Sequence, residues 1–152
     1  MKRLLLTTAA AGLTMLVAAT ALPAGDDDVV TERYYAAETW SSFADTGRPN
    51  PGRAGPGDVY TSRLRLSTLD GTRVGTAHGY SVGLRAPFAF THLTAMLPKG
   101  TLTLEGATNA RTNGMQRFAI VGGTGGYDGA RGSVSVSDAG KNGVLALLRF
   151  RL

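Results

Sequence analysis

The chain has 152 residues, which is enough for one domain of ordinary size, with 43% hydrophobic and 18% charged residues as in a globular protein. It contains 21 glycines, two histidines and no cysteine. The lack of cysteine excludes disulfides, thiolate nucleophiles, cysteine-ligated zinc and iron–sulfur clusters, and two histidines exclude a three-histidine metal centre.

The formal net charge of +5 is unevenly distributed along the chain. Residues 25–58 carry three basic and seven acidic side chains, whereas residues 59–152 carry eleven basic and four acidic ones. The basic residues are scattered and form neither a run nor a motif that reads bases. We therefore expect an acidic arm before a basic body, and no nucleic-acid partner.

Residues 1–24 have the pattern of a secretory signal peptide. Lys2 and Arg3 precede an uncharged, apolar stretch over 4–21, and Ala19-Thr20-Ala21 offers an A-x-A cleavage site. A membrane anchor is the alternative, but acidic residues rather than basic ones follow the stretch. Without cysteine, lipoprotein anchoring is excluded. We expect a secreted, extracellular protein with no stable membrane anchor after cleavage.

The rest of the chain divides into an N-terminal arm, residues 25–57, and a body, residues 58–152. The arm ends in a Pro/Gly-rich loop over 47–57, and residues 33–43 within it fit either a first strand or a short helix. In the body, apolar and polar residues alternate in seven short stretches. These predicted strands are 59–68, 73–84, 87–97, 101–107, 117–121, 132–137 and 143–152.

This two-residue period predicts an all-β fold. No 3.6-residue periodicity follows residue 25, and hairpin signals such as Asp70-Gly71 separate the strands. Closure would remove the exposed edges of so many short strands, so we predict an eight-stranded antiparallel β-barrel with an apolar lumen. A barrel of that size has room for its own side chains or for one small ligand. Small residues alternate along one predicted strand, which fits either a tight barrel corner or space for that ligand: Gly75, Ala77, Gly79, Ser81 and Gly83.

Two motifs suggest chemistry at first sight. Residues 79–83 match G-x-S-x-G, but that nucleophile motif needs a following helix, which Leu84 to Pro87 cannot begin. The glycine-rich residues 121–132 lack the Lys-Ser/Thr pair of a phosphate-binding loop and precede no helix. We interpret the first as strand glycines and the second as a long connection between strands. Neither motif, nor Asp26 to Asp28, predicts a metal site.

The candidate site residues are the larger aromatic and polar side chains of the predicted strands. We expect catalytic candidates in Tyr80, His78 and Glu105, because phenol, imidazole and carboxylate groups can polarise or protonate a bound molecule. His78 and Tyr80 lie two residues apart and therefore share a face. The predicted ligand-binding residues are Tyr60, His78, Tyr80, Phe88, Phe90 and Met96.

Three stretches together resemble the allene oxide cyclase-like barrel superfamily, which includes dirigent proteins and bacterial spirotetronate-type cyclases. They are residues 74–79, residues 101–106, and residues 118–125 with 129–132. The resemblance implies an eight-stranded barrel with an apolar lumen, no cofactor, and a homodimer or homotrimer. It also implies that such a barrel steers the cyclisation or coupling of hydrophobic substrates. No individual catalytic residue is carried over, because the lumen residues differ between its branches.

The sequence thus predicts a secreted, cofactor-free barrel that binds a hydrophobic polyene, polyketide or lipid-like small molecule. Confinement would direct the cyclisation of that molecule, as in a cofactor-independent cyclase of isomerase or pericyclic type. The alternatives are a non-catalytic dirigent-like scaffold or lipophilic carrier, and a barrel whose lumen is filled by its own side chains.

Overall fold

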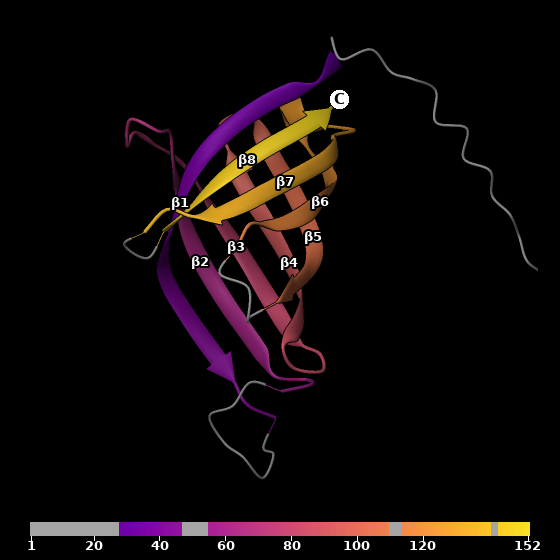
Figure 1. The fold of residues 1–152 in the computed structure, drawn as a ribbon. Coiled ribbons are helices and arrows are strands. Elements are labelled where there is room, and N and C mark those ends of the chain that lie inside the picture. Colours follow the sequence, from indigo (N-terminus) through magenta and orange to yellow (C-terminus); the bar gives the residue numbers. More distant parts are fainter. Residues whose placement is uncertain (1–27, 47–54, 110–113, 141–142) are drawn as a thin grey trace, which may run out of the picture.

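A computed structural model describes residues 28–46, 55–109, 114–140 and 143–152 (Figure 1). The predicted signal peptide and most of the predicted Pro/Gly loop lie outside these residues. The described chain forms eight strands and one short 3₁₀ turn, η2, over Gly125–Tyr127. The strands are β1 Val30–Ala44, β2 Val59–Ser67, β3 Arg73–Gly83, β4 Phe88–Leu97, β5 Gly100–Asn109, β6 Gln116–Gly123, β7 Arg131–Asp138 and β8 Gly143–Arg151.

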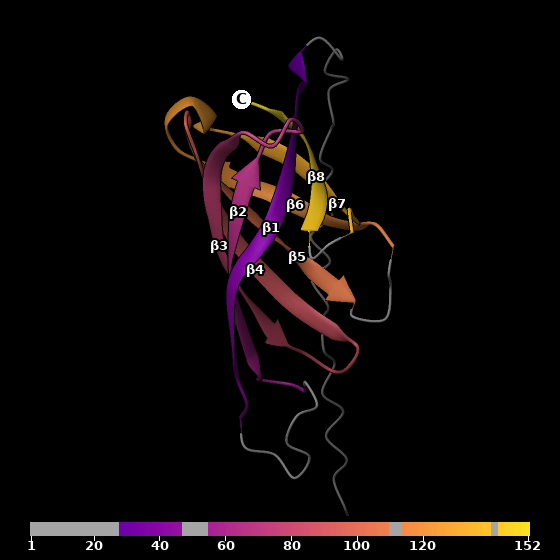
Figure 2. The ribbon, with the colours of Figure 1, turned by 90° about the vertical axis from the view of Figure 1, so that its left-hand side faces the viewer.

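The eight strands form a closed antiparallel barrel in chain order, as predicted. Each strand pairs with the next, and β8 closes the barrel by pairing with β1. Figures 1 and 2 show β1 curving along the whole length of the barrel. Its first part, Val30 to Ala37, pairs with β8, and its later part, Tyr35 to Ala44, pairs with β2. The segment that fits a strand or a helix in the sequence is therefore a strand that closes the barrel.

β1 has a bulge between Glu38 and Trp40, just beyond Ala37, the last residue that pairs with β8. The connection that follows is anchored by the buried carboxylate of Asp58. Its Oδ1 accepts hydrogen bonds from the amide and hydroxyl of Thr46 at 3.0 and 2.8 Å, and its Oδ2 accepts one from the amide of Gly55 at 2.6 Å. These bonds hold the ends of the connection together.

Small residues on the inner face of β3 allow a close approach between neighbouring strands. A Cβ at Gly75 would lie 2.1 Å from the carbonyl oxygen of Met96, and one at Gly79 would lie 2.7 Å from that of His92. The sequence left two interpretations of this face open, a tight barrel corner or space for a ligand. At Gly75 and Gly79 the tight corner is the one that the structure shows. Ala77, between them, is fully buried.

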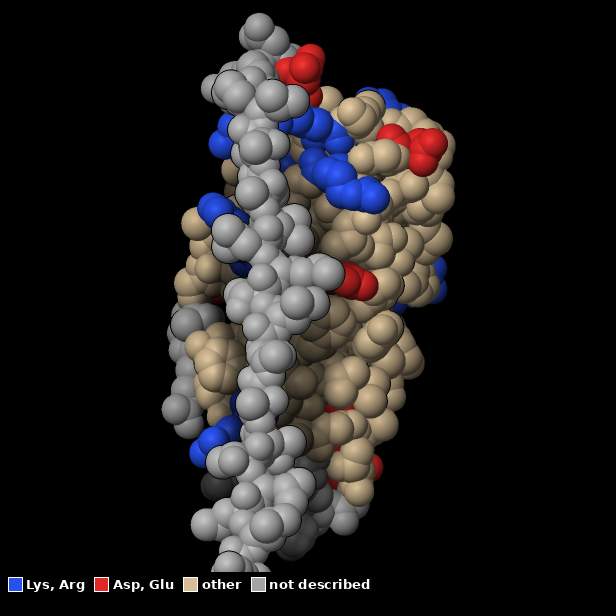
Figure 3. Space-filling view, turned by 90° about the vertical axis from the view of Figure 1, so that its right-hand side faces the viewer, with Lys and Arg blue, Asp and Glu red and all other residues tan. Residues whose placement is uncertain are grey.

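One cluster of buried apolar side chains surrounds the inside of the barrel and includes residues from all eight strands and η2. Most of the charged side chains that the structure describes lie on the outside, whereas Asp58 is buried and the side chain of Glu32 is only 15% exposed. On the face in Figure 3, Lys and Arg side chains lie in several separate places, with uncharged surface between them. No helix among the described residues has the length and hydrophobicity needed to cross a membrane.

Candidate functional site

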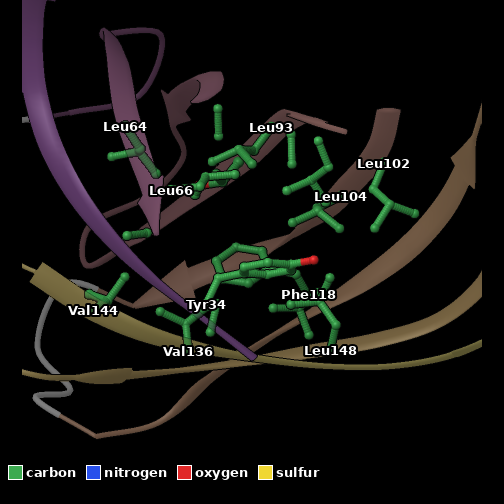
Figure 4. A pocket seen from close by; sticks show the side chains of 17 residues that line it. Tyr34, Leu64, Leu66, Leu93, Leu102, Leu104, Phe118, Val136, Val144 and Leu148 are labelled. Atoms are coloured by element: carbon green, nitrogen blue, oxygen red, sulfur yellow. The ribbon is translucent and has the colours of Figure 1, made fainter. Parts of the chain in front are cut away.

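The barrel encloses a cavity of about 260 Å³, here called the lumen cavity. Its accessible wall is apolar throughout. The barrel is therefore not filled by its own side chains, which rules out the third sequence-based alternative. The residues that line it are Tyr34, Ala36, Leu64, Leu66, Ala77, Thr91, Leu93, Ala95, Leu97, Leu102, Leu104, Phe118, Val134, Val136, Val144, Ala146 and Leu148 (Figure 4).

The strand period explains which residues face the cavity. The lining residues are even-numbered in β1, β2 and β5 to β8, and odd-numbered in β3 and β4. Successive side chains of a strand point to opposite faces, so this parity assigns every other residue of β3 and β4 to the outer surface.

One end of the lumen is covered by a polar cluster, here called the capped end, consisting of Glu32, Tyr34, Lys99 and Tyr127. The hydroxyl of Tyr34 donates to Oε2 of Glu32 at 2.7 Å, and that of Tyr127 donates to the same atom at 3.1 Å. The ammonium of the exposed Lys99 lies 3.6 Å from Oε1. Tyr127, in η2, is 2% exposed and packs edge-to-face on Phe150 at a centroid distance of 5.8 Å. It therefore reaches across this end of the barrel towards β1 and β8.

Burial and this hydrogen bonding keep both phenols protonated. Burial, followed by the hydrogen bond to Glu32, raises the pKa of Tyr34 well above its usual value. Burial likewise raises the pKa of Tyr127. The Tyr34 ring lies across the cavity beside Phe118 in Figure 4, while its hydroxyl is engaged with Glu32. Among the residues that the structure describes, the cavity wall thus presents no free acid or base to a bound molecule.

The opposite end of the barrel contains an open chamber of about 340 Å³, here called the mouth chamber. Four residues, Thr91, Phe118, Val136 and Val144, line both this chamber and the lumen cavity, so the two spaces adjoin. The remaining lining residues are mostly polar: Ser81, Thr108, Gly114, Gln116, Ser137 and Asp138.

The structure places most of the predicted ligand-binding residues on the outer surface. His78 and Tyr80 of β3 and Phe88, Phe90 and Met96 of β4 have the parity that faces away from the lumen, and all five are exposed. The expectation that these five side chains line the lumen is therefore wrong. Their role in binding any ligand stays a prediction.

Tyr60 differs from the other five. It shares the inward parity of Leu64 and Leu66, but it lies near the start of β2, is 36% exposed and does not line the lumen cavity. Its hydroxyl donates a hydrogen bond to the carboxylate of Glu38.

Two of the three catalytic candidates, Tyr80 and Glu105, each contact His92 on the outer surface. The Tyr80 ring stacks on His92 with a centroid distance of 5.3 Å, and Nδ1 of His92 lies 3.0 Å from Oε1 of Glu105. His78 lies on the same outer face of β3, two residues before Tyr80. Tyr80, His92 and Glu105 lie side by side because they are directly opposite one another on the paired strands β3, β4 and β5. Their catalytic role stays a prediction.

The candidate site residues predicted from the sequence do not include Glu32, Tyr34, Tyr127 or Gln116. In β1, every second residue from Val30 to Ala36 faces inward, and this two-residue period could have indicated Glu32 and Tyr34. The first segment predicted from the sequence begins only at residue 33. Tyr127 lies in the glycine-rich connection, where no pattern indicates its burial. Among the described residues, no three His, Asp or Glu side chains are placed to hold a metal ion.

Residues 41–145 match the family described as the allene oxide cyclase barrel like domain. The chain belongs to this family. The match runs from the end of β1 to the start of β8, so Gln116 and Thr91 lie within it. Glu32 and Tyr34 of the capped end precede it.

Solved structures share the barrel of this allene oxide cyclase-like chain. A pyocyanin demethylase is 26% identical, with a TM-score of 0.69 over 79% of this chain and 99% of its own. A Diels–Alderase from Streptomyces koyangensis is 21% identical, with a TM-score of 0.60 over 84% of this chain and 70% of its own. A pterocarpan synthase dirigent protein is 19% identical, with a TM-score of 0.61 over 80% and 82%. The last two likenesses show the shared fold. No curated protein matches the chain.

Proposed function

We propose that this protein binds one compact, apolar small molecule in the lumen cavity and directs its ring closure by confinement. The observation that carries the proposal is an apolar cavity of about 260 Å³, adjoining a chamber that opens at one end of the barrel. The names of its structural relatives, which include Diels–Alderases and dirigent proteins, support a barrel that directs cyclisation or coupling.

The volume of the cavity limits the size of the ligand. An engineered apolar cavity of about 150 Å³ in another protein stays dry and binds benzene. The lumen cavity is larger and suits a body of about two fused rings, or a polyene folded to that size. A longer polyketide or lipid chain would extend into the mouth chamber.

The apolar wall favours a reaction that needs no proton transfer. In a ring closure of the [4+2] type, a diene and an alkene convert three π bonds into two σ bonds and one π bond. No atom leaves, and no oxidant, reductant or base takes part. Holding the two reacting segments together in advance can lower the barrier by about 7 kcal/mol or more, provided that their geometry is near that of the reaction.

A non-catalytic scaffold or carrier is the second candidate. The observation that favours it is the same lack of a free acid or base in the cavity wall, since a carrier needs only apolar contact. Both candidates require saturable binding in the lumen. Only the first requires that the protein change the rate or the product distribution of a linear substrate.

The test uses a variant that fills the lumen. Ala95 lines the cavity and is 6% exposed, so Ala95→Leu removes ligand space. Ala119→Leu adds the same atoms on the outer face of β6. We expect calorimetry to show that the unaltered chain and Ala119→Leu bind naphthalene saturably, and that Ala95→Leu binds it at least tenfold more weakly. Equal affinities in all three proteins would contradict lumen binding.

Turnover then separates the two candidates. The protein is incubated with linear diene–alkene substrates that cyclise slowly in water, and the products are compared with those formed without protein. Faster or stereochemically biased cyclisation that Ala95→Leu removes supports the cyclase. Binding with unchanged products supports the carrier or scaffold.

We further propose export and self-association. The charged start, apolar stretch and small-residue end of residues 1–24 support secretion, and mass spectrometry of the extracellular protein would find a new N-terminus between residues 22 and 25. The exposed Tyr80, Phe88 and Phe90 support association of copies into a dimer or trimer. Light scattering would detect that oligomer and its loss in Phe90→Glu.

A further inference from the structure

We propose that the protein binds a soluble molecule carrying two linked phosphate or sulfate groups in a groove on the outer surface of β6, β7 and β8. This groove, here called the arginine groove, is a hollow of about 370 Å³. Its polar side chains face away from the lumen, because they have the opposite parity from the lumen-lining residues of the same strands. The inference is therefore independent of the proposed function. The polar residues of the arginine groove are Arg117, Arg131, Ser133, Ser135, Arg149 and Arg151.

The barrel brings together arginines that are scattered in the sequence. Arg131 of β7 is directly opposite Arg151 of β8, and Arg149 lies on the same face of β8, two residues before Arg151. Arg117 lies on β6, the strand on the other side of β7. Four cations thus line one hollow on three paired strands, and none of its described lining residues is acidic.

Most of this positive charge is accessible and unpaired. Arg117, Arg131 and Arg149 are exposed, and none of them forms an ion pair with a described residue. The described residues include Asp28, the acid closest in sequence to Val29, which lines the groove. The three guanidinium groups can therefore contact an anion from solution.

An anion in the groove would offset a repulsion that the fold contains. Like charges directly opposite one another on neighbouring strands destabilise a sheet. Arg131 and Arg151 occupy such positions. An anion between them attracts both guanidinium groups, so its binding would reduce a free-energy cost that the empty groove carries.

Two serine hydroxyls lie among the arginines and add neutral donors. Ser133 is directly opposite Arg149, and Ser135 is directly opposite Arg117. Neither hydroxyl forms a hydrogen bond with another described residue. A serine hydroxyl has one proton to donate, so each can donate to an oxygen of an anion held by the neighbouring guanidinium group.

The donors and their spacing indicate the class of ligand. A guanidinium group presents a rigid fork of N–H donors, which matches two oxygens of a phosphate or sulfate group. Arg131 lies at one end of the groove, and Arg117 lies opposite Ser135, four residues further along β7 and so roughly 13 Å away. A single anionic group contacts only some of these arginines, whereas two linked groups contact arginines towards both ends.

Calorimetry with inorganic pyrophosphate tests the proposal. We expect saturable binding of one pyrophosphate per chain, at least tenfold tighter than that of inorganic phosphate. The affinity should fall as salt is added, because exposed charges are screened. A lack of saturable pyrophosphate binding, or equal affinity for inorganic phosphate, would overturn the proposal.

A pair of double variants assigns the binding to the groove. Arg131→Gln with Arg149→Gln removes two groove charges, and we expect it to bind pyrophosphate at least tenfold more weakly. Arg63→Gln with Arg65→Gln is the matched control, because it removes the same net charge from exposed positions on β2. It should bind within about threefold of the original chain. Equal weakening in both double variants would contradict a local site.

Two further measurements separate a guanidinium site from a general positive field and from misfolding. Arg131→Lys with Arg149→Lys keeps the charge but loses both forks, so we expect pyrophosphate affinity to fall at least threefold. Unchanged affinity would contradict binding by guanidinium groups. The urea midpoint of Arg131→Gln with Arg149→Gln should equal or exceed that of the original chain, because the repulsion from Arg151 is removed. A lower midpoint would show that these arginines stabilise the fold instead.

Phosphate groups also occur on lipid headgroups, so the source of the ligand is tested separately. We expect no co-sedimentation of the protein with phosphatidylcholine vesicles that contain phosphatidic acid, because headgroups in a flat surface reach a hollow less readily than a free molecule does. Co-sedimentation that Arg131→Gln with Arg149→Gln removes would overturn the soluble source.

Discussion

Tyr34 donates a 2.7 Å hydrogen bond to Glu32, the preceding inward residue of β1, and its ring forms part of the apolar cavity wall. One side chain thereby separates a carboxylate from the lumen. The Glu32 side chain is only 15% exposed, and the hydroxyls of Tyr34 and Tyr127 satisfy it within the barrel end. This arrangement keeps a carboxyl group close to the cavity without exposing it to the ligand.

Removing the Tyr34 hydroxyl should weaken the capped end but not the lumen. Tyr34→Phe keeps the ring in the cavity wall and takes one donor from a largely buried carboxylate. We expect the free energy of unfolding to fall by about 1–2 kcal/mol in urea denaturation, with naphthalene affinity within about twofold of the original. Tyr80→Phe, which alters an exposed ring on the outer face, should change stability by less than about 0.5 kcal/mol. Equal losses in both variants would contradict a special role for the Glu32 bond.

The same bond predicts a loss of stability at high pH. The pKa of Tyr34 in the folded protein lies above its usual value of 10.0, because of burial and then of the bond to Glu32. Above that usual value, the unfolded chain releases the phenol proton while the folded protein keeps it. The unfolded state then binds fewer protons, so this contribution to stability is complete below about pH 10 and decreases above it.

The measurement compares urea midpoints of the original chain and Tyr34→Phe at pH 9, 10 and 11. We expect the original chain to lose stability more steeply above pH 10, by up to about 1.4 kcal/mol per pH unit for the one proton of Tyr34. The pKa of Tyr127 is also raised, first by burial, so some loss of stability at high pH remains in Tyr34→Phe. Parallel pH profiles would show that Tyr34 titrates alike in the folded and unfolded states.

The close approach of β3 and β4 predicts that Gly75 tolerates no side chain. A Cβ there would meet the carbonyl oxygen of Met96 at 2.1 Å, and that oxygen belongs to the strand paired with β3. We expect Gly75→Ala to lower the free energy of unfolding by about 2–4 kcal/mol in urea. Gly122→Ala is the control, because its Cβ would meet only the Arg131 side chain at 3.5 Å. If the two variants are equally stable, the strands have room to separate.

The outer position of Glu105 predicts that it does not act on a ligand in the lumen. Its carboxylate pairs with His92 at 3.0 Å on the outside of the barrel. We expect Glu105→Gln to leave naphthalene affinity and the products of linear substrates unchanged within about twofold. Loss of turnover with intact binding would instead place the chemistry on the outer surface, with Tyr80 and His92.

Much of the barrel was predictable because strand spacing is a local property. The alternating stretches at 59–68, 73–84 and 87–97 agree with β2, β3 and β4 to within one residue at each end. The first strand was harder to predict, because apolar Trp40 and Phe43 follow a bulge that shifts the alternation. A bulge disturbs the period that identifies a strand, and its position depends on the neighbouring strands.

The amino-acid sequence by itself determined the two-residue period of the strands, the number of strands and the fact that His78 and Tyr80 lie on the same face of one strand. Only the tertiary structure decided that this face is the outer one. Both faces of β4 carry apolar residues, such as Phe90 on one and Leu93 on the other, so hydrophobicity alone does not choose between them. The choice follows from packing in three dimensions: β3 and β4 approach so closely at Gly75 and Gly79 that the small face of β3 must turn inward. The larger aromatic side chains are left outside, and leucine, valine and alanine side chains make up most of the wall of the cavity.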